Sequence, residues 1–390
     1  MEHFDFDTVP ERRGTGSYKW DSADAPDVLP MWVADMDFRT APCVIKALER
    51  RVEQGIFGYT YVPEDYYSAV IDWFDRRHSW KIERSSILYT SGVVPAVSAI
   101  IKALASPGDK VIVQTPVYNC FFSSIRNNGC RIVESPLVAE SAGEDEFSYR
   151  IDFDSLERVA SDAANTMLVL CNPHNPGGRV WTPAELTRVR DICARHGVQV
   201  VSDEIHCELT MPGYEYTPYG TIDPEAIVCL SPSKAFNTAG LQIANIISSS
   251  AEKRARIDRA ININEVCDVN PFGVEALIAS YSPAGEEWLG RLKAYLADNW
   301  EYTRQWLHTH LPGCPVARLE ATYLPWVDVS SLGVTGTELM ERIERECRVK
   351  VNDGAMYGDD RYIRLNIACP RHLLEEAYDR MAAGLERIIK

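Results

Sequence analysis

Short apolar runs alternate with longer amphipathic stretches along the middle of the chain, from about residue 85 to residue 250. The runs KVIV at 110–113, MLVLC at 167–171 and IVCL at 227–230 have almost no polar positions, which is typical of strands buried on both faces. Helical patterns separate successive runs. This alternation predicts an α/β unit whose central sheet is mainly parallel and flanked by helices.

One helix of this unit has clear start and stop signals. Thr182 is the expected N-cap, Pro183 occupies the first turn, and Glu185 stands three residues after the threonine, which is the spacing of a capping box. Gly197 is a good C-terminal residue because glycine adopts the left-handed conformation without strain. We therefore expect a helix between Thr182 and Gly197.

The pattern changes after about residue 285. A helical stretch at 286–311 leads into the apolar run YLPWVDV, the helical segment TELMERIERECR, the run YIRLNIACP and a final helix that ends near Lys390. This order predicts a smaller α+β domain. We expect a large domain at 46–284 and a small domain made of 1–45 and 285–390.

Composition limits the possible partners. The 390 residues are 46% hydrophobic and 25% charged, which is typical of a globular chain, and the net charge of −16 argues against nucleic acid or an anionic membrane. No uncharged apolar run approaches the roughly 18–20 residues of a membrane helix. The acidic N-terminus lacks an apolar core, so we expect no signal peptide.

The cysteines favour a reducing compartment. Their number, 11, is odd, and no CxxC pair occurs. Cys171 and Cys229 lie within apolar runs, where a free thiol behaves as a small hydrophobic group. We expect reduced thiols and a cytoplasmic protein.

Unusual polar residues follow the apolar runs, where an open parallel sheet binds its ligands. Lys234 stands in LSPSKAFNTAG among small residues; enclosure there would favour its neutral, nucleophilic amine, although a surface turn explains the stretch equally well. Asp203 ends the run VQVVSD and could face a positive partner. By itself it fits an N-cap or loop aspartate better.

Four further features could serve a ligand. The turn Asn172-Pro-His-Asn-Pro-Gly-Gly178 could aim an asparagine, and Ser91-Gly-Val-Val94 precedes a helix, where free amides favour an anion. Arg364 in an apolar run could bind a carboxylate or pair with a buried acid, and we favour the ligand. Tyr118 could stack on a flat ring, although at that position alone core packing explains it better.

Several other chemistries lack their motifs. The sequence has no GxxxxGK[ST], no GxGxxG and no GxSxG, which argues against a P-loop, a nicotinamide cofactor and a hydrolase triad. No HExxH or Cys/His cluster is present, and His308 and His310, two residues apart on a helix, do not share a face. We expect no metal site.

Together, these motifs and their order resemble fold type I pyridoxal 5′-phosphate (PLP) enzymes of the class I/II aminotransferase superfamily. The resemblance extends from about residue 30 to the C-terminus. Within it, the chain looks like the cystathionine β-lyase, or cysteine-S-conjugate β-lyase, branch (MalY/PatB-type). The stretches that carry this resemblance are LPMWVADMDF, FGYTY, SGVVPA, NPHNPGGRVW, SDEIHCEL, SPSKAFNTAGLQIAN and RLNIACPR.

The resemblance assigns catalytic roles to three residues. Lys234 is expected to form a Schiff base with PLP and then to act as the base. Asp203 is expected to face the pyridine nitrogen and keep it protonated, and Tyr118 to stack on the ring. Arg364 is expected to bind the α-carboxylate of an amino-acid substrate, with Asn175 close to both substrate and cofactor.

It also implies the remaining cofactor contacts. Asn175 is expected to reach the ring's 3-oxygen; His206 replaces a tyrosine of related aminotransferases, so its contact with that oxygen is left open. The expected phosphate ligands are Val93, Val94, Ser231 and Ser233. Tyr59 of FGYTY is expected to reach the phosphate of a neighbouring subunit, which implies a homodimer with shared sites.

Two departures bear on the reaction. Related aminotransferases carry an arginine eight residues after the lysine, where this chain has Gln242; glutamine favours the lyase branch. Tyr214-Glu-Tyr216 replaces an expected histidine-containing segment, which concerns substrate preference. The expected reaction is α,β-elimination from a cysteine thioether to thiol, pyruvate and ammonia. An aminotransferase is the alternative, followed by a PLP-binding regulatory protein without turnover.

Overall fold

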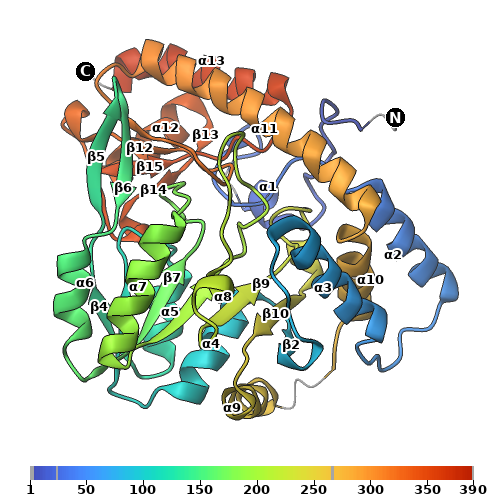
Figure 1. The fold of residues 1–390 in the computed structure, drawn as a ribbon. Helices are drawn as coiled ribbons and strands as arrows, with labels where there is room; N and C mark the ends of the chain where they lie inside the picture. The colour runs from blue at the N-terminus through green and yellow to red at the C-terminus, as the bar shows by residue number, and fades with distance from the viewer. Residues whose placement is uncertain (1–3, 23–24, 265–267, 389–390) are drawn as a thin grey trace.

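The computed structural model describes residues 4–22, 25–264 and 268–388 (Figure 1). Its larger sheet has seven strands in the order β2 (Ile87–Thr90), β10 (Ala244–Ile247), β9 (Ile227–Leu230), β8 (Gln199–Asp203), β7 (Asn165–Cys171), β3 (Lys110–Val113) and β4 (Arg131–Glu134). Strands β9, β8, β7, β3 and β4 pair in parallel, and β10 runs antiparallel to both of its neighbours. The predicted, mainly parallel sheet is confirmed.

Both faces of this sheet are covered by helices. Val111 and Val113 point into a core shared with α4 (Val93–Leu104), α5 (Cys120–Asn127) and α9 (Ala251–Asn262). Ile112, between them, points into a second core shared with α6 (Phe153–Ala160) and α7 (Pro183–His196). Successive strand residues face opposite sides. The continuous apolar runs are therefore the consequence of burial on both faces.

Helix α7 confirms the predicted signals. Thr182 accepts a hydrogen bond from the amide of Glu185, and the Glu185 side chain bonds back to the amide of Thr182. The helix ends at Gly197, whose φ of 69° lies in the left-handed region. Helix α7 packs against one face of the large sheet, in which strand β8 ends at Asp203.

A second sheet has six strands in the order β14 (Asn352–Asp353), β15 (Tyr362–Arg364), β12 (Trp326–Asp328), β11 (Val316–Ala317), β6 (Glu146–Arg150) and β5 (Val138–Gly143). The hairpin of β5 and β6 comes from the range predicted as the large domain, but β6 pairs with β11 from the C-terminal part. Figure 1 shows the hairpin near β12 and β15 of the same sheet. The range predicted as the large domain thus contributes two strands to the second sheet. The domain boundaries themselves stay a prediction.

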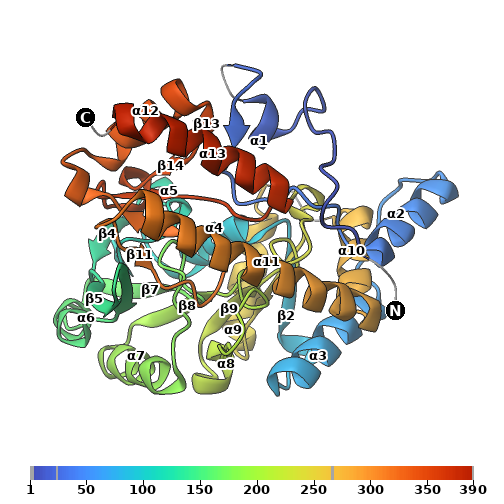
Figure 2. The same ribbon diagram turned by 90° about the horizontal axis from the view of Figure 1, so that it is seen from above.

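The N-terminal segment packs with the C-terminal part. Strand β1 (Leu29–Pro30) pairs in parallel with β13 (Val349–Lys350), and the long helix α11 (Pro283–His310) runs beside α13 (Arg371–Ile388) (Figure 2).

The other helices are α1 (Tyr18–Asp21), α2 (Pro42–Gln54), α3 (Glu64–His78), α8 (Tyr219–Ile222), α10 (Pro271–Ser280) and α12 (Gly336–Cys347), with short 3₁₀ turns η1 (Arg84–Ser86), η2 (Ala239–Leu241), η3 (Ser330–Leu332) and η4 (Ala355–Tyr357).

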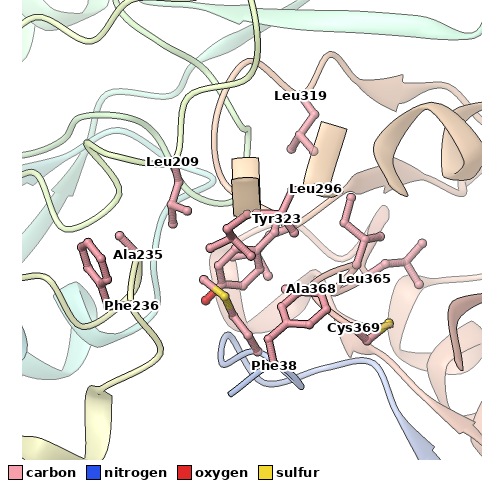
Figure 3. Close-up of a cluster of buried hydrophobic side chains, with 14 of the residues drawn as sticks. Phe38, Leu209, Ala235, Phe236, Leu296, Leu319, Tyr323, Leu365, Ala368 and Cys369 are labelled. Atoms are coloured by element: carbon pink, nitrogen blue, oxygen red, sulfur yellow. The ribbon is translucent and has the colours of Figure 1, made fainter. Parts of the chain in front are cut away.

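An apolar core joins these parts behind the predicted lysine. Figure 3 shows Ala235 and Phe236, which follow Lys234, in the same cluster as Phe38 and Tyr323. Phe236 is fully buried and stacks on Trp288 of α11 with ring centroids 5.7 Å apart. The lysine segment is therefore anchored by packing from three distant stretches of sequence.

Within residues 4–22, 25–264 and 268–388, no helix is long and apolar enough to span a membrane. No disulfide bond joins the ten cysteines within the described ranges, and Cys267 lies outside them. No group of three or more His, Cys, Asp or Glu side chains with metal-binding geometry was found in the same ranges.

Candidate active site

A cavity of about 440 Å³ lies at the carboxyl ends of β7 and β8, against the second sheet. It brings together nine of the predicted site residues from widely separated parts of the chain. These are Val93, Val94, Tyr118, Asn175, Asp203, His206, Ser233, Lys234 and Arg364. Gln242 also lines the cavity. Ser231 and Tyr59 do not.

Lys234 lies in the segment that follows β9, half-buried at the cavity wall. Its Nζ donates a hydrogen bond to the carbonyl of Ala34 at 2.7 Å. Burial, together with the positive charge of Arg364, lowers the pKa of Lys234 to about 8, while the charges of Asp35 and Asp203 partly oppose this effect. A substantial fraction of the amine is therefore neutral near physiological pH, as a nucleophile or base requires.

Asp203 is the last residue of β8 and is 4% exposed. One of its oxygens accepts a hydrogen bond from the amide of Ile205 at 3.1 Å. Burial raises the pKa of Asp203 to about 6, although the Ile205 amide and the charge of Lys234 act in the opposite direction. A cationic group placed beside this carboxylate would stabilise its ionised form, and the carboxylate would in turn favour the cation.

His206 and Tyr118 border the cavity as uncharged groups. His206 is 3% exposed, and its burial and the charges of Lys234 and Arg364 lower the pKa of the imidazole to about 3. Its Nδ1 has no hydrogen-bond partner among the described residues. Burial raises the pKa of Tyr118, so its phenol stays protonated at neutral pH. Both side chains can bond to a ligand without adding charge.

Arg364 ends β15 and is 3% exposed. Its Nη1 donates to Asn175 Oδ1 and its Nη2 to the carbonyl of Trp32, both at 3.1 Å, and its guanidinium lies 4.7 Å from the ring of Tyr357. Nε has no partner in the described ranges. The structure contains no carboxylate bound to this arginine in the described residues, so its fork remains available to an anionic ligand.

The amino end of α4 forms another wall. Val93 and Val94 begin this 12-residue helix, and no side chain caps it. Its first amides and positive dipole therefore favour an anion in the cavity. Ser233 lines the same cavity, whereas Ser231 lies behind it, receiving a hydrogen bond from the Ser233 amide at 3.1 Å and donating to the carbonyl of Ile243 at 2.7 Å. Ser231 thus supports Ser233.

Tyr59 lies elsewhere on the chain. The segment at 55–63 links α2 to α3, and the Tyr59 side chain is 97% exposed. It takes no part in the cavity of its own chain. The expectation that it serves a neighbouring subunit stays a prediction.

The cavity also has walls that the sequence patterns did not single out. Trp32 lies in LPMWVADMDF, one of the stretches that carry the family resemblance, and Asn119 and Cys120 directly follow Tyr118. Their positions in the sequence could therefore have identified these three residues as part of the site. Tyr18, Asn352, Met356 and Tyr357 gave no sequence signal. They reach the cavity because the N-terminal segment and β13 to η4 fold back together onto the large sheet.

The residues present fit PLP. An anion site at the start of α4, a carboxylate at the end of β8 and a partly neutral lysine amine match three of the cofactor's polar groups: its phosphate, its pyridine nitrogen and its aldehyde. Nδ1 of His206 and Nε of Arg364 are buried and have no hydrogen-bond partner among the described residues, so both atoms have bonding capacity that a ligand in the cavity could use.

Comparisons with known proteins agree with this arrangement. The chain is 39% identical to cystathionine beta-lyase PatB of Bacillus subtilis (strain 168), over 97% of this chain and 99% of that protein. It is 32% identical to protein MalY of Escherichia coli (strain K12), over 99% of both chains. The crystal structure of cystalysin from Treponema denticola, which contains a PLP cofactor, superposes with a TM-score of 0.94 at 32% identity, covering 99% of this chain and 100% of that one.

A model of the family described as aminotransferase class I and II matches residues 26–381. That range includes every residue that lines the cavity except Tyr18. The resemblance and the fold class expected from the sequence are confirmed. The chain belongs to the aminotransferase class I and II family.

Proposed function

We propose that this chain is a PLP-dependent carbon–sulfur β-lyase, which cleaves the Cβ–S bond of a cysteine thioether and, with one molecule of water, gives a thiol, pyruvate and ammonia. The observation that carries the proposal is one cavity that joins a half-buried lysine amine, a strand-end carboxylate and an arginine fork. Similarity to PatB over nearly the whole chain supports the choice of the reaction.

When bound, PLP supplies an aldehyde that captures an amine and an electron-withdrawing ring that makes the substrate Cα–H acidic. Lys234 Nζ is the group that would hold the cofactor and, once released, accept the Cα proton. The Asp203 carboxylate would hold a proton at the ring nitrogen, and Tyr118 would fix the plane of the ring. These groups act mainly by position, since all face one cavity.

The substrate would be oriented by its carboxylate. Arg364 would bind both oxygens, and Tyr357 beneath the guanidinium keeps this side chain in place. Asn175 accepts a hydrogen bond from Arg364 and would also bond to the 3-oxygen of the ring, so it would link the substrate-binding arginine to the cofactor. The neutral His206 lines the same cavity. Val93, Val94 and Ser233 would hold the phosphate, with Ser231 supporting Ser233. Gln242 lies where related aminotransferases place an arginine and would offer only neutral bonds.

The direct test uses protein loaded with PLP and supplied with L-cystathionine or an S-alkyl-L-cysteine, without any keto acid. We expect continuous, stoichiometric release of pyruvate and free thiol over many turnovers. Formation of one equivalent of pyridoxamine phosphate without pyruvate would instead identify an aminotransferase. An absorbing complex that releases no product from any of these amino acids would identify a binding protein without turnover.

We also propose a cytoplasmic homodimer in which Tyr59 reaches the phosphate of the neighbouring site. Its support is an exposed apolar segment: Ile56, Phe57, Tyr59 and Tyr61 are 67%, 57%, 97% and 82% exposed. Mixing two inactive variants, Tyr59→Ala and Lys234→Ala, tests the shared site. Mixed dimers regain activity if one site receives both intact residues; with no regain at a demonstrated mixing of subunits, the site is not shared.

A further inference from the structure

Part of the cavity lining next to Arg364 consists of Tyr18, Trp32, Cys120, Asn352, Met356 and Tyr357, which we call the outer wall. Four of these residues are linked to one another. Asn352 Nδ2 donates to the carbonyl of Trp32 at 3.0 Å and to the Tyr357 hydroxyl at 3.2 Å, and the rings of Tyr18 and Trp32 are 5.3 Å apart. The carbonyl of Trp32 also accepts from Arg364. The outer wall therefore begins where the substrate carboxylate would be bound.

The outer wall carries no formal charge. Among the described residues that line the cavity, only Asp203, Lys234 and Arg364 are charged, because His206 has its pKa lowered by burial to about 3. All three charges serve the amino-acid end of a substrate or the cofactor in the proposed reaction. The thioether substituent would instead meet aromatic rings, a methionine and a thiol, which make favourable contacts with sulfur and alkyl groups.

Charged residues behind this wall are already engaged. Lys350 Nζ lies 5.0 Å from the ring of Trp32 and 3.5 Å from Glu344. Asp353 accepts a hydrogen bond from the amide of Met356 at 3.1 Å, and Asp35 pairs with Arg12 at 2.7 Å. None of them lines the cavity. They would have to leave these partners to meet a charged substituent.

The exposed loop at 55–63, which we propose to reach a neighbouring site, adds no charge either. Its sequence, GIFGYTYVP, contains three aromatic and three aliphatic or proline side chains and no acidic or basic residue. Even a site completed by a second subunit through this loop would keep an uncharged, aromatic surround for the substituent on sulfur.

We infer that the enzyme selects cysteine thioethers whose leaving thiol is uncharged and apolar, such as S-alkyl or S-aryl cysteines, over L-cystathionine. The leaving half of cystathionine carries an ammonium and a carboxylate, which would be partly desolvated against an outer wall that offers neutral hydrogen-bonding groups and no charged partner. An alkyl group of the same length gains from the same contacts. This inference rests on the proposed lyase function and specifies its substrate class.

The experiment compares kcat/KM for pyruvate release from S-butyl-L-cysteine and from L-cystathionine, whose leaving groups have the same four-carbon length. We expect the butyl substrate to be preferred at least about tenfold by the PLP-loaded enzyme. Equal rates, or a preference for cystathionine, would overturn the inference and leave the lyase function intact. No pyruvate from either substrate would overturn the function itself, which separates the two failures.

A variant locates the preference in the outer wall. Met356 is 38% exposed, so Met356→Arg can place a cation beside the substituent without filling the core. We expect the butyl-to-cystathionine ratio to fall about tenfold, because the guanidinium can pair with the second carboxylate. Met356→Gln controls for lost apolar contact, and Ile263→Arg, 53% exposed and outside the cavity, controls for added charge. An unchanged ratio in Met356→Arg would show that the outer wall does not contact the leaving group.

Discussion

Two buried polar regions of this molecule share one short segment but differ in how their groups are satisfied. At one end of the segment, Asp203 and His206 face the cavity; among the described residues, the Asp203 side chain accepts one backbone hydrogen bond and Nδ1 of His206 has no partner. At the other end, Glu208 accepts four hydrogen bonds from Trp73, Arg77 and His78. The first region has unmet bonding capacity, and the second is saturated.

The difference appears in the charges as well. Burial raises the pKa of Asp203, whereas in Glu208 burial is outweighed by the hydrogen bond from His78 and the charges of His78 and Arg77, which lower the pKa to about 2. Unmet polar groups cost stability and await a ligand; saturated ones hold the chain together. Substitutions in the two regions should therefore have opposite effects on activity and on stability.

The largest effect on activity is expected for Lys234→Met. Loss of the amine should lower kcat for pyruvate release by more than about 10³-fold, because no other lining residue can replace the base. The cofactor-free variant should resist urea at least as well as the wild-type protein, since the methionine removes a partly buried amine. Lys253→Met is the matched control, because Lys253 Nζ bonds to Glu225 and lies outside the cavity. Retained turnover would remove Lys234 from the mechanism.

Glu208→Gln should show the reverse. It leaves the Arg77 guanidinium without its buried carboxylate, which we expect to lower the free energy of unfolding by about 3 kcal/mol. The kcat per folded, PLP-loaded molecule should change little, because Glu208 does not line the cavity. Glu286→Gln, which removes a more exposed partner of the same arginine, should cost less than about 1 kcal/mol. Equal losses in both variants would contradict the saturated character of the Glu208 cluster.

Arg364→Lys should weaken the substrate grip selectively. The charge remains but the fork of donors is lost, so we expect KM for the amino acid to rise about 10- to 100-fold with a smaller change in kcat. Arg361→Lys, three residues earlier and paired with Asp359 at the surface, controls for the substitution. A fall in kcat alone would assign Arg364 to the chemical step instead.

Lowering the pH should change the stability contributions of Glu208 and Asp203 in opposite directions. Glu208 has its folded pKa lowered to about 2, below the ordinary value of 4.5, so its stabilising effect is present above pH 4.5 and is lost as pH falls towards 2. Asp203 has its pKa raised to about 6, so its ionised form costs stability as pH rises from about 4 to 6. In cofactor-free protein, the deficit of Glu208→Gln should shrink below pH 4.5, while Asp203→Asn should gain stability over wild type between pH 4 and 6. Urea titrations over this range measure both.

Sequence patterns predicted the residues at strand ends, because strand period and loop position follow local rules. Asp203, Asn175 and Lys234 come directly after buried apolar runs, and parallel strands bring such ends to one edge. The outer wall could not be found in this way. Tyr18 and Tyr357 are 339 positions apart and line one cavity, and the segments that carry them are joined by the pairing of β1 with β13, a long-range contact without local signal. The position of the β5–β6 hairpin in the second sheet was missed in the same way, because its pairing with β11 is also a long-range contact.

The smallest expected effect is that of Gln242→Arg. This variant tests whether residue 242 only holds the cofactor phosphate or also affects proton transfer. Gln242 already holds a left-handed backbone, with φ of 53°, so arginine brings no new backbone strain. A cation near the start of α4 should slow PLP dissociation several-fold, because it adds a charge-assisted bond to the phosphate. Pyruvate release should change less than about threefold, since proton transfer depends on Lys234. If the variant instead accumulated pyridoxamine phosphate, residue 242 would direct the proton as well as hold the phosphate, and the choice between elimination and transamination would lie at this single position.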